Sequence, residues 1–382
     1  MIYTGSFMQK LAVIALVFLA SGAWAQKKSF PQVDAGSDFA CALVNGQLWC
    51  WGANPYIWPD KADGVYGPRR IGPDKVWKAM ACTGEDVVAL DEKGVAWGWG
   101  YGDWLHNKDD DDSIAHKYKR RIYPIDIFNG MTWAKIDISS YRFAGIALDG
   151  TLWLAGRDDC GVFFSASDNL PRPVQKAGTW TEVAMGNMHG VVMDTDHAIW
   201  TWGDNGYSQL GLGEIRTGRA SRDCTPFKAV APGEPWKAIS VCTTNTAAIR
   251  QDGSLWFWGT HNYDIVNPEF TVVPTRIGGD AIWIAVSTHE IHTLAVREDG
   301  SLWGRGGNSH GQLGDGTTIS RMDLTRIGKD TDWVAVKAGL YMSLAVKKNG
   351  TVWAWGDNQA GMVGDGTTTD RHSPNEVPLK VR

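Results

Sequence analysis

After its first 25 residues, the 382-residue sequence has no long apolar run, and its basic residues do not outnumber its acidic ones. A membrane-spanning helix needs about 20 apolar residues, so we expect no membrane insertion of residues 26–382. Lys and Arg together number 37 against 42 Asp and Glu, which gives a net charge of −5. Because nucleic-acid binding depends on neutralising phosphates, we also expect no nucleic-acid partner.

Motifs for catalysis and metal binding are scarce. The sequence has neither a phosphate-binding G-x-x-x-x-G-K-[ST] loop nor an H-E-x-x-H pair. The stretch HEIH at 289–292 puts two histidines on opposite faces of a strand, and the acidic run KDDDDS at 108–113 lacks the alternate spacing of a calcium loop. We therefore expect no catalytic residue, no metal and no cofactor.

The apolar segment LAVIALVFLA lies at 11–20, near the start of the chain. A short basic stretch, MQK at 8–10, precedes it, and the small-x-small sequence AWA at 23–25 follows it. This order is typical of a secretory signal peptide, so we expect residues 1–25 to be removed before Gln26. Residues 26–382 are then expected to form one domain in the periplasm or outside the cell.

Tryptophan and glycine are abundant, with 21 and 45 residues. Most tryptophans belong to a recurring phrase, such as GQLWCWG at 46–52, GSLWFWG at 253–259 and GTVWAWG at 350–356. Trp256 and Trp258 are two residues apart, so both point to one face of a strand, while Leu255 and Phe257 point to the other. A strand that is apolar on both faces is expected between two packed sheets, where the wide rings fill the space.

Another aromatic residue, which is tryptophan in six of the seven units, opens a short alternating run before each phrase. Each interval between these residues, 47 to 56 residues long, holds that run, a strand–turn–strand unit such as TAAIRQDGSLWFWG, a loop and a short Pro-containing piece. Seven units of about four strands predict an all-β, seven-bladed β-propeller. The opening positions are Phe30, Trp77, Trp133, Trp180, Trp236, Trp283 and Trp333.

Closure of the ring raises a question at the two ends of the repeat array. The first unit has only QKKS before Phe30, whereas each later unit has a Pro-containing piece before its opening tryptophan. The segment SPNEVPLKVR at 373–382 is left over at the other end. Because an open sheet edge is a liability, we predict that residues 373–382 pair into blade 1 and close the ring.

Six cysteines in an exported chain can form disulfides. If Asn45-Gly46 is a two-residue turn, Cys41 faces Cys50 in a non-hydrogen-bonded pair, where side chains come closest. We predict a Cys41–Cys50 disulfide, with two separately packed thiols as the alternative.

The remaining four cysteines are more widely separated. Cys160 and Cys224 lie in loops after blades 3 and 4, on neighbouring parts of one face, and we expect them to form a second disulfide. Cys82 and Cys242 belong to distant blades and are expected to stay reduced.

Several repeats resemble those of the regulator of chromosome condensation family: DGSLWGRGGNSHGQLGDGTT at 299–318, NGTVWAWGDNQAGMVGDGTT at 349–368 and WGDNGYSQLGLG at 202–213. The resemblance covers residues 30–382, although units 3 and 5 have lost the Gly-Gln-Leu-Gly loop. It implies a seven-bladed propeller, with His189 and His292 at a position where the family often has a structural histidine. Secreted bacterial propellers of this family include protein inhibitors of β-lactamases that bind through one face, which implies binding rather than chemistry.

The loop after each phrase, here called the exit loop, is expected to emerge on the same face of the ring in every blade. Since Tyr and Trp dominate protein-binding hot spots, we predict that exit-loop aromatic residues bind an unidentified protein and that the chain is a monomer. Two alternatives remain: the rings pack onto their own loops, or the propeller is a lyase or hydrolase with a central active site. The predicted binding residues are Tyr56, Trp58, Tyr101, Trp104, Phe163, Phe164, Tyr207 and Tyr263.

Overall fold

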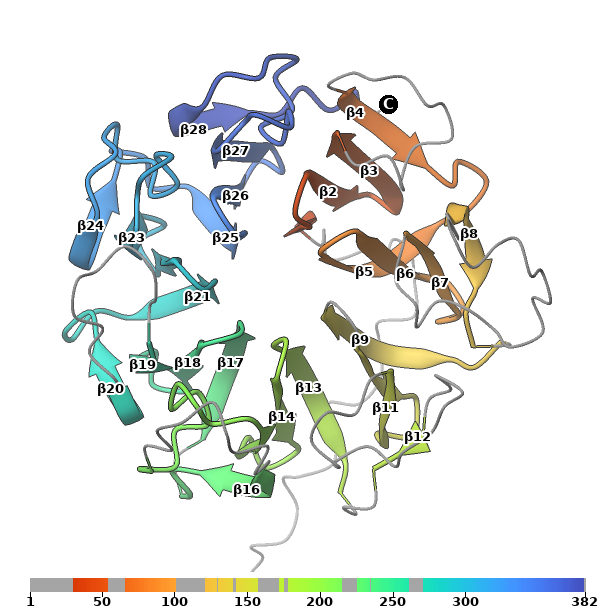
Figure 1. Cartoon of the computed structure of the whole chain (residues 1–382), viewed down its shortest axis with the longest axis vertical. Coiled ribbons are helices and arrows are strands. Elements are labelled where there is room, and N and C mark those ends of the chain that lie inside the picture. The colour runs from red at the N-terminus through yellow and green to blue at the C-terminus, as the bar shows by residue number, and fades with distance from the viewer. Residues whose placement is uncertain are drawn as a thin grey trace, which may run out of the picture.

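The computed structural model describes residues 30–53, 66–100, 121–128, 130–139, 142–156, 172–174, 178–214, 225–233, 235–260 and 271–380. Within these residues, the strands β1 to β28 form seven sheets of four strands each. Figure 1 shows the sheets as blades arranged in a closed ring around a central axis. The predicted seven-bladed β-propeller is confirmed.

Each blade uses four consecutive strands, paired antiparallel in chain order, and the first strand of each lies nearest the axis (Figure 1). Blade 1 comprises β1–β4, blade 2 β5–β8, blade 3 β9–β12, blade 4 β13–β16, blade 5 β17–β20, blade 6 β21–β24 and blade 7 β25–β28. The strand bounds are β1 Gln32–Ala35, β2 Phe39–Val44, β3 Gln47–Gly52, β4 Tyr66–Ile71, β5 Trp77–Thr83, β6 Asp86–Asp91, β7 Ala96–Gly100, β8 Arg121–Asp126, β9 Trp133–Ser139, β10 Arg142–Ala147, β11 Leu152–Gly156, β12 Arg172–Pro173, β13 Trp180–Met185, β14 His189–Asp194, β15 Ile199–Gly203, β16 Thr225–Val230, β17 Trp236–Val241, β18 Asn245–Arg250, β19 Leu255–Gly259, β20 Thr271–Ile277, β21 Trp283–Thr288, β22 His292–Arg297, β23 Leu302–Gly306, β24 Arg321–Ile327, β25 Trp333–Ala338, β26 Met342–Lys347, β27 Val352–Gly356 and β28 Arg371–Glu376.

The repeated sequence signals fall at the strand boundaries. The recurring phrase forms the third strand of each blade, and in six blades the opening tryptophan is the first residue of the first strand. Phe30 behaves differently, because it precedes β1 and is 47% exposed. The first blade therefore begins without the buried ring that its sequence position suggests.

The hydrophobic core is divided into clusters that lie between neighbouring blades. On one face of β19, Trp256 and Trp258 pack with Trp236 and blade 4. On the other face, Leu255 packs with Trp283 of blade 6. Burying a large aromatic ring removes about 150–250 Å² from water, or about 4–6 kcal/mol at 25 cal/mol per Å². The tryptophans of the phrase are therefore mainly structural, as expected.

The predicted closure by residues 373–382 is wrong. The strand β28 pairs with β27 of its own blade, with Ala354 opposite Asn375, and blade 1 already has four strands of its own. Each Pro-containing piece is thus the fourth strand of the unit that precedes it, and it pairs antiparallel with the third strand after the exit loop. The first unit therefore needs no strand from the C-terminus. Side chains close the ring instead: Val377 and Leu379 pack in a cluster with Trp51 of blade 1.

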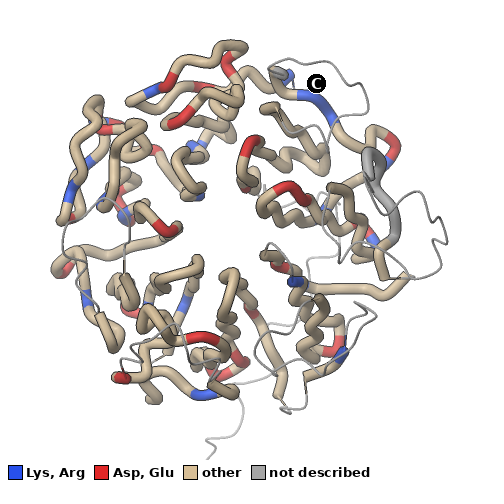
Figure 2. The backbone as a smooth tube through the Cα atoms, viewed as in Figure 1, with Lys and Arg blue, Asp and Glu red and all other residues tan. Residues whose placement is uncertain are grey.

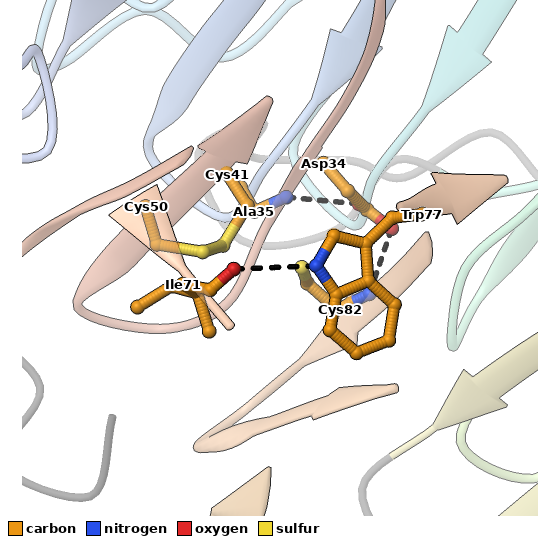
Figure 3. The surroundings of a disulfide bond; sticks show 7 residues. All are labelled: Asp34, Ala35, Cys41, Cys50, Ile71, Trp77 and Cys82. Atoms are coloured by element: carbon orange, nitrogen blue, oxygen red, sulfur yellow. Dashed lines mark hydrogen bonds between the residues drawn. A yellow bond between two sulfur atoms is a disulfide. The ribbon is translucent and has the colours of Figure 1, made fainter. Parts of the chain in front are cut away.

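The disulfide predicted in blade 1 is present, and it faces blade 2 (Figure 3). Asn45 and Gly46 both have positive φ, of 51° and 76°, as a two-residue type I′ turn requires. Cys41 is opposite Cys50 in the β2–β3 register, and their Cα atoms are 4.1 Å apart. The second predicted pair, Cys160 and Cys224, lies outside the described residues.

Two cysteines, Cys82 and Cys242, are buried free thiols in the structure, as expected. Burial raises the pKa of both, that of Cys242 to about 12. Neither thiol is therefore activated as a nucleophile at neutral pH.

In the described parts of the chain, no helix has the length and apolar character needed to cross a membrane.

Candidate protein-binding face

The exit loops and the turns between the first and second strands lie at the same end of the blades. In blade 7, Asp357 at the start of the exit loop donates its backbone N–H to the carbonyl oxygen of Tyr341, in the turn after β25 (3.0 Å). The same bond joins Asp204 to Met188 in blade 4 (2.9 Å). This end of the ring is called the exit-loop face below.

Tyr207 is the predicted binding residue that falls within the described residues. It is half-buried in the exit loop of blade 4, and its backbone N–H donates to the Gln209 side-chain oxygen (2.8 Å). The other predicted residues, Tyr56, Trp58, Tyr101, Trp104, Phe163, Phe164 and Tyr263, lie outside the described residues.

Buried polar groups hold the exit loops of blades 4, 6 and 7 in shape. In blade 6, the Asn308 side chain accepts from Leu313 N (2.8 Å) and donates to Thr317 O (3.0 Å). Gly314 then turns with a φ of +78°, and a Cβ there would lie 2.6 Å from Trp355 Nε1 of blade 7. The loop is therefore fitted against the neighbouring blade, which makes it a firm support for surface residues.

A single backbone carbonyl joins this loop to the next blade. Gln312 O accepts from Trp355 Nε1 (2.9 Å) and from Ser343 Oγ (2.7 Å), both in blade 7. Because the Ser343 hydroxyl proton is used in that bond, His292 Nε2 is the donor in its contact with Ser343 Oγ (2.8 Å). Burial lowers the pKa of His292 to about 3, so this imidazole is neutral.

Blade 4 repeats the arrangement. Gln209 O accepts from Trp258 Nε1 (2.9 Å) and Thr246 Oγ1 (3.0 Å), and His189 Nε2 lies 3.3 Å from Thr246 Oγ1. Burial lowers the pKa of His189 to about 3 as well. The structural role expected for His189 and His292 is confirmed.

Near the axis, charged side chains of the first strands bond to the next blade rather than project freely. Asp34 Oδ2 accepts from Cys82 N of blade 2 (2.8 Å), and its other oxygen pairs with Lys337 Nζ of blade 7 (2.9 Å) (Figure 3 shows the former). Asp137 Oδ2 accepts from Met185 N of blade 4 (2.7 Å). Burial raises the pKa of Asp137 to about 6. Both carboxylates accept backbone hydrogen bonds from the next blade, so Asp34 and Asp137 link neighbouring blades.

One group of side chains has the composition of a cation site. His310 of blade 6 and Asp357 and Asp370 of blade 7 each offer a ligand atom, and these atoms lie within 4.8 Å of one another. His310 Nδ1 is 3.3 Å from Asp370 Oδ2, and its ring lies 4.9 Å from that of Tyr341. The group can pair through the imidazole proton or share a divalent cation.

One pattern was missed in the sequence. The stretch GNSHG at 307–311 has the G-x-S-x-G spacing of a hydrolase nucleophile elbow. A working elbow places its serine on a sharp turn between a strand and a helix. Ser309 instead lies in the exit loop of blade 6, which leads to β24 without a helix. The pattern therefore arises from the repeat loop.

Known proteins match parts of this chain. A family model described as "Regulator of chromosome condensation (RCC1) repeat" matches residues 333–361. The Protein RCC2 homolog of Xenopus laevis is 34% identical over 275 residues, which are 60% of this chain and 51% of the relative. The human E3 ubiquitin-protein ligase HERC2 is 28% identical over 197 residues, which are 47% of this chain and 4% of the relative.

Solved structures share the whole ring. The structure of Kap60 bound to yeast RCC1 (Prp20) matches with a TM-score of 0.73 at 18% identity, over 99% of this chain and 92% of the matched chain. At that identity the likeness shows the fold alone. This chain therefore shares the full propeller with a solved protein but spans only 4% to about half of the length of the two curated relatives. The matched repeat, the relatives and the seven-bladed ring together show that the chain is similar to RCC1-repeat proteins and shares their propeller fold.

Proposed function

We propose that this chain is an exported scaffold that binds another protein through its exit-loop face. The observation that carries the proposal is how the face is built: exit loops of different sequence are tied to the next blade by the same bonds, from Trp258 to Gln209 and from Trp355 to Gln312. Variable loops on a rigid scaffold are a common place for recognition. The complex of Kap60 with yeast RCC1 (Prp20) supports the proposal, because a relative in fold takes part in a protein complex.

Two features support export. Residues 1–25 have the composition of a secretory signal peptide, and blade 1 contains the Cys41–Cys50 disulfide. Disulfides form and persist in oxidising compartments and are rare where thiols are kept reduced.

The exit-loop face also offers side chains suited to protein contact. Met188, in the turn of blade 4, is 37% exposed, and Tyr207 and Tyr341 are half-buried on the same face. Tyrosine and methionine are enriched at the cores of protein interfaces. The described part of the face therefore has the composition expected of a binding surface.

Site-specific photo-crosslinking tests the proposal. A benzophenone amino acid replaces Met188 in one variant and Leu148 in the other. Leu148 is 65% exposed in the turn after β10, at the opposite end of the blades. Each purified variant is irradiated in the native envelope or culture fluid. A defined protein adduct at position 188 and none at position 148 is expected; adducts at position 148 alone, or at neither, contradict the proposal.

A further inference from the structure

Side chains of two neighbouring blades meet on the exit-loop face, where the loops of blades 6 and 7 lie side by side (Figure 1). His310 belongs to the exit loop of blade 6, and Asp357 and Asp370 belong to that of blade 7; these three residues are called the His–Asp cluster. One nitrogen or oxygen atom of each lies within 4.8 Å of the others, and all three residues are half-buried. The cluster thus brings a nitrogen ligand and two carboxylates to one place.

Backbone bonds hold the two loops in this arrangement. Gly316 N of the blade 6 loop donates to His372 O of β28 (2.8 Å), and Gln312 O of the same loop accepts from Trp355 Nε1 (2.9 Å). Both partners belong to blade 7. The position of His310 relative to the aspartates is therefore set by the fold and not by the three side chains alone.

Both carboxylates are oriented by backbone groups. Asp370 Oδ1 accepts from Asn358 N (2.9 Å), and Asp357 Oδ1 accepts from Gln359 N (2.9 Å). Hydrogen bonds of this kind fix the direction in which a carboxylate can bind a metal, and they strengthen metal binding.

The contact between imidazole and carboxylate has the length expected of two ligands that share an ion. His310 Nδ1 is 3.3 Å from Asp370 Oδ2. A charge-assisted N–H···O bond is usually about 2.7–2.9 Å long. Two ligands that are each about 2.0–2.1 Å from a tetrahedral Zn²⁺ are about 3.3–3.4 Å apart. The Tyr341 ring, 4.9 Å from that of His310, limits how far the imidazole can move.

The arginines of these loops do not neutralise the cluster. Acidic and basic residues are interspersed in this part of the ring (Figure 2). Arg321 pairs with Asp315 (2.7 Å), and Arg371 pairs with Asp365 (2.6 Å). In the described part of the chain, the one ion pair of the cluster is that between its own imidazole and carboxylate. Two carboxylates thus face one imidazole, and a divalent cation would offset their charge.

The repeat itself does not require the cluster. Aligned on Asn308 and Asn358, the exit loops of blades 6 and 7 share the asparagine that shapes them but differ at all three cluster positions. The residues that stand at these positions in the other loop are Ala360, Gly307 and Ser320. The loop forms without the cluster side chains, so a role in loop shape does not account for them.

We propose that His310, Asp357 and Asp370 bind a divalent transition-metal ion, Zn²⁺ in the first place. Imidazole nitrogen and carboxylate oxygen are both common ligands of Zn²⁺, whereas Ca²⁺ and Mg²⁺ take oxygen ligands. The ion would join the exit loops of blades 6 and 7, and three protein ligands leave a fourth position for water. This inference does not depend on whether the exit-loop face binds a protein.

The chain offers a matched pair of variants for the test. The site variant is His310→Asn, Asp370→Asn, in which the new side chain at position 370 keeps an oxygen that can accept from Asn358 N. The control variant, His197→Asn, Asp196→Asn, makes the same chemical changes in the exposed turn between β14 and β15, at the opposite end of the blades. Both variants lose one imidazole and one carboxylate, so they differ in where these groups are removed.

Isothermal titration of the untagged, chelator-treated chain with ZnCl₂ measures binding. The unmodified chain and the control variant should each bind a single Zn²⁺ with the same affinity. The site variant should bind it at least about a hundredfold more weakly, because two of the three ligands are gone. Since a ligand of the folded state stabilises that state, Zn²⁺ should also raise the melting temperature of the first two proteins but not of the site variant. CaCl₂ should do neither.

Three outcomes would overturn the inference: no Zn²⁺ binding by the unmodified chain, equal binding by the site variant, or binding of Ca²⁺ as tight as that of Zn²⁺. Melting curves without metal establish whether the site variant is folded. If it is not, Asp357→Asn replaces it, because this change keeps the contact between His310 and Asp370. Asp357→Asn should still weaken Zn²⁺ binding at least about tenfold. Unchanged affinity in that variant also contradicts the proposed site.

Discussion

Trp51 of blade 1 donates its indole N–H to the backbone carbonyl of Met362 in blade 7 (2.7 Å), across 311 residues of sequence. Trp258 and Trp355 make the same bond to glutamine carbonyls of the preceding blades. The bond that closes the ring between blades 7 and 1 is therefore the same as the bond that joins blade 4 to blade 5 and blade 6 to blade 7. Because the acceptor is a backbone atom, methionine can stand at position 362 in place of glutamine.

Replacing Trp51 by Phe should weaken closure. The change keeps an aromatic ring but removes the donor, so a buried carbonyl loses its partner at a cost of about 1–2 kcal/mol of unfolding free energy. Trp49→Phe is the matched control, because Trp49 Nε1 makes no hydrogen bond among the described residues. Denaturant unfolding of both variants measures the difference. An equal loss in the two would show that ring size, rather than the bond, matters at position 51.

The fold could be predicted from the sequence because one sequence repeat occurs seven times. The spacing of residues such as Trp77, Trp236 and Trp333 marks the start of each blade, and the alternation in LWFW gives both buried faces. Closure could not be predicted so easily. A Pro-containing piece between two units fits either neighbour by composition, and the antiparallel pairing of Ala354 with Asn375 is what assigns it to the earlier unit.

The candidate site was less predictable than the fold. Exit loops leave the repeat pattern, so their aromatic residues could be named but not positioned from the sequence.

Peptide mapping without reduction should recover Cys41 linked to Cys50 and, by our sequence expectation, Cys160 linked to Cys224. Cys82 and Cys242 should resist alkylation in the folded protein, because burial both shields these thiols and raises their pKa. Both should react once the chain is unfolded in denaturant. A free thiol at Cys41 contradicts the first pair, and rapid native labelling of Cys242 contradicts its burial.

Stability should fall as pH is lowered from about 6.5 towards 3. The folded-state pKa of His189 and of His292 is about 3, whereas an unfolded histidine titrates near 6.5, so the unfolded chain binds more protons in this window. Each buried histidine should then lower the unfolding free energy by about 1.4 kcal/mol for each unit that the pH falls. Asp137 has the opposite effect below about pH 6, because its raised pKa makes the folded state take up a proton before the unfolded chain does. This offsets the loss of stability from one histidine.

Two variants check the source of that slope. His292→Gln should reduce the fall in unfolding free energy between pH 6.5 and 4.5 by about one proton equivalent. His372→Gln, at an exposed position of β28, should leave the slope as it is. Urea unfolding at several pH values gives both slopes. If His292→Gln lowers stability equally at every pH, its imidazole contributes packing but not the pH dependence.

Truncation of the exit-loop tryptophans tests where a partner is held. Trp58 and Trp104 are the tryptophans of residues 26–382 that the blade pattern does not use, and both follow a recurring phrase. If they anchor a partner, Trp58→Ala or Trp104→Ala should cost about 2 kcal/mol or more of affinity, which is about a thirtyfold rise in Kd. Unfolding free energy should change little, and Trp58→Phe should retain part of the affinity. Titration against the partner identified by crosslinking, together with a melting curve for each variant, supplies both readouts. Should either alanine variant unfold, that tryptophan packs within its own loop and the binding site must be sought elsewhere on the face.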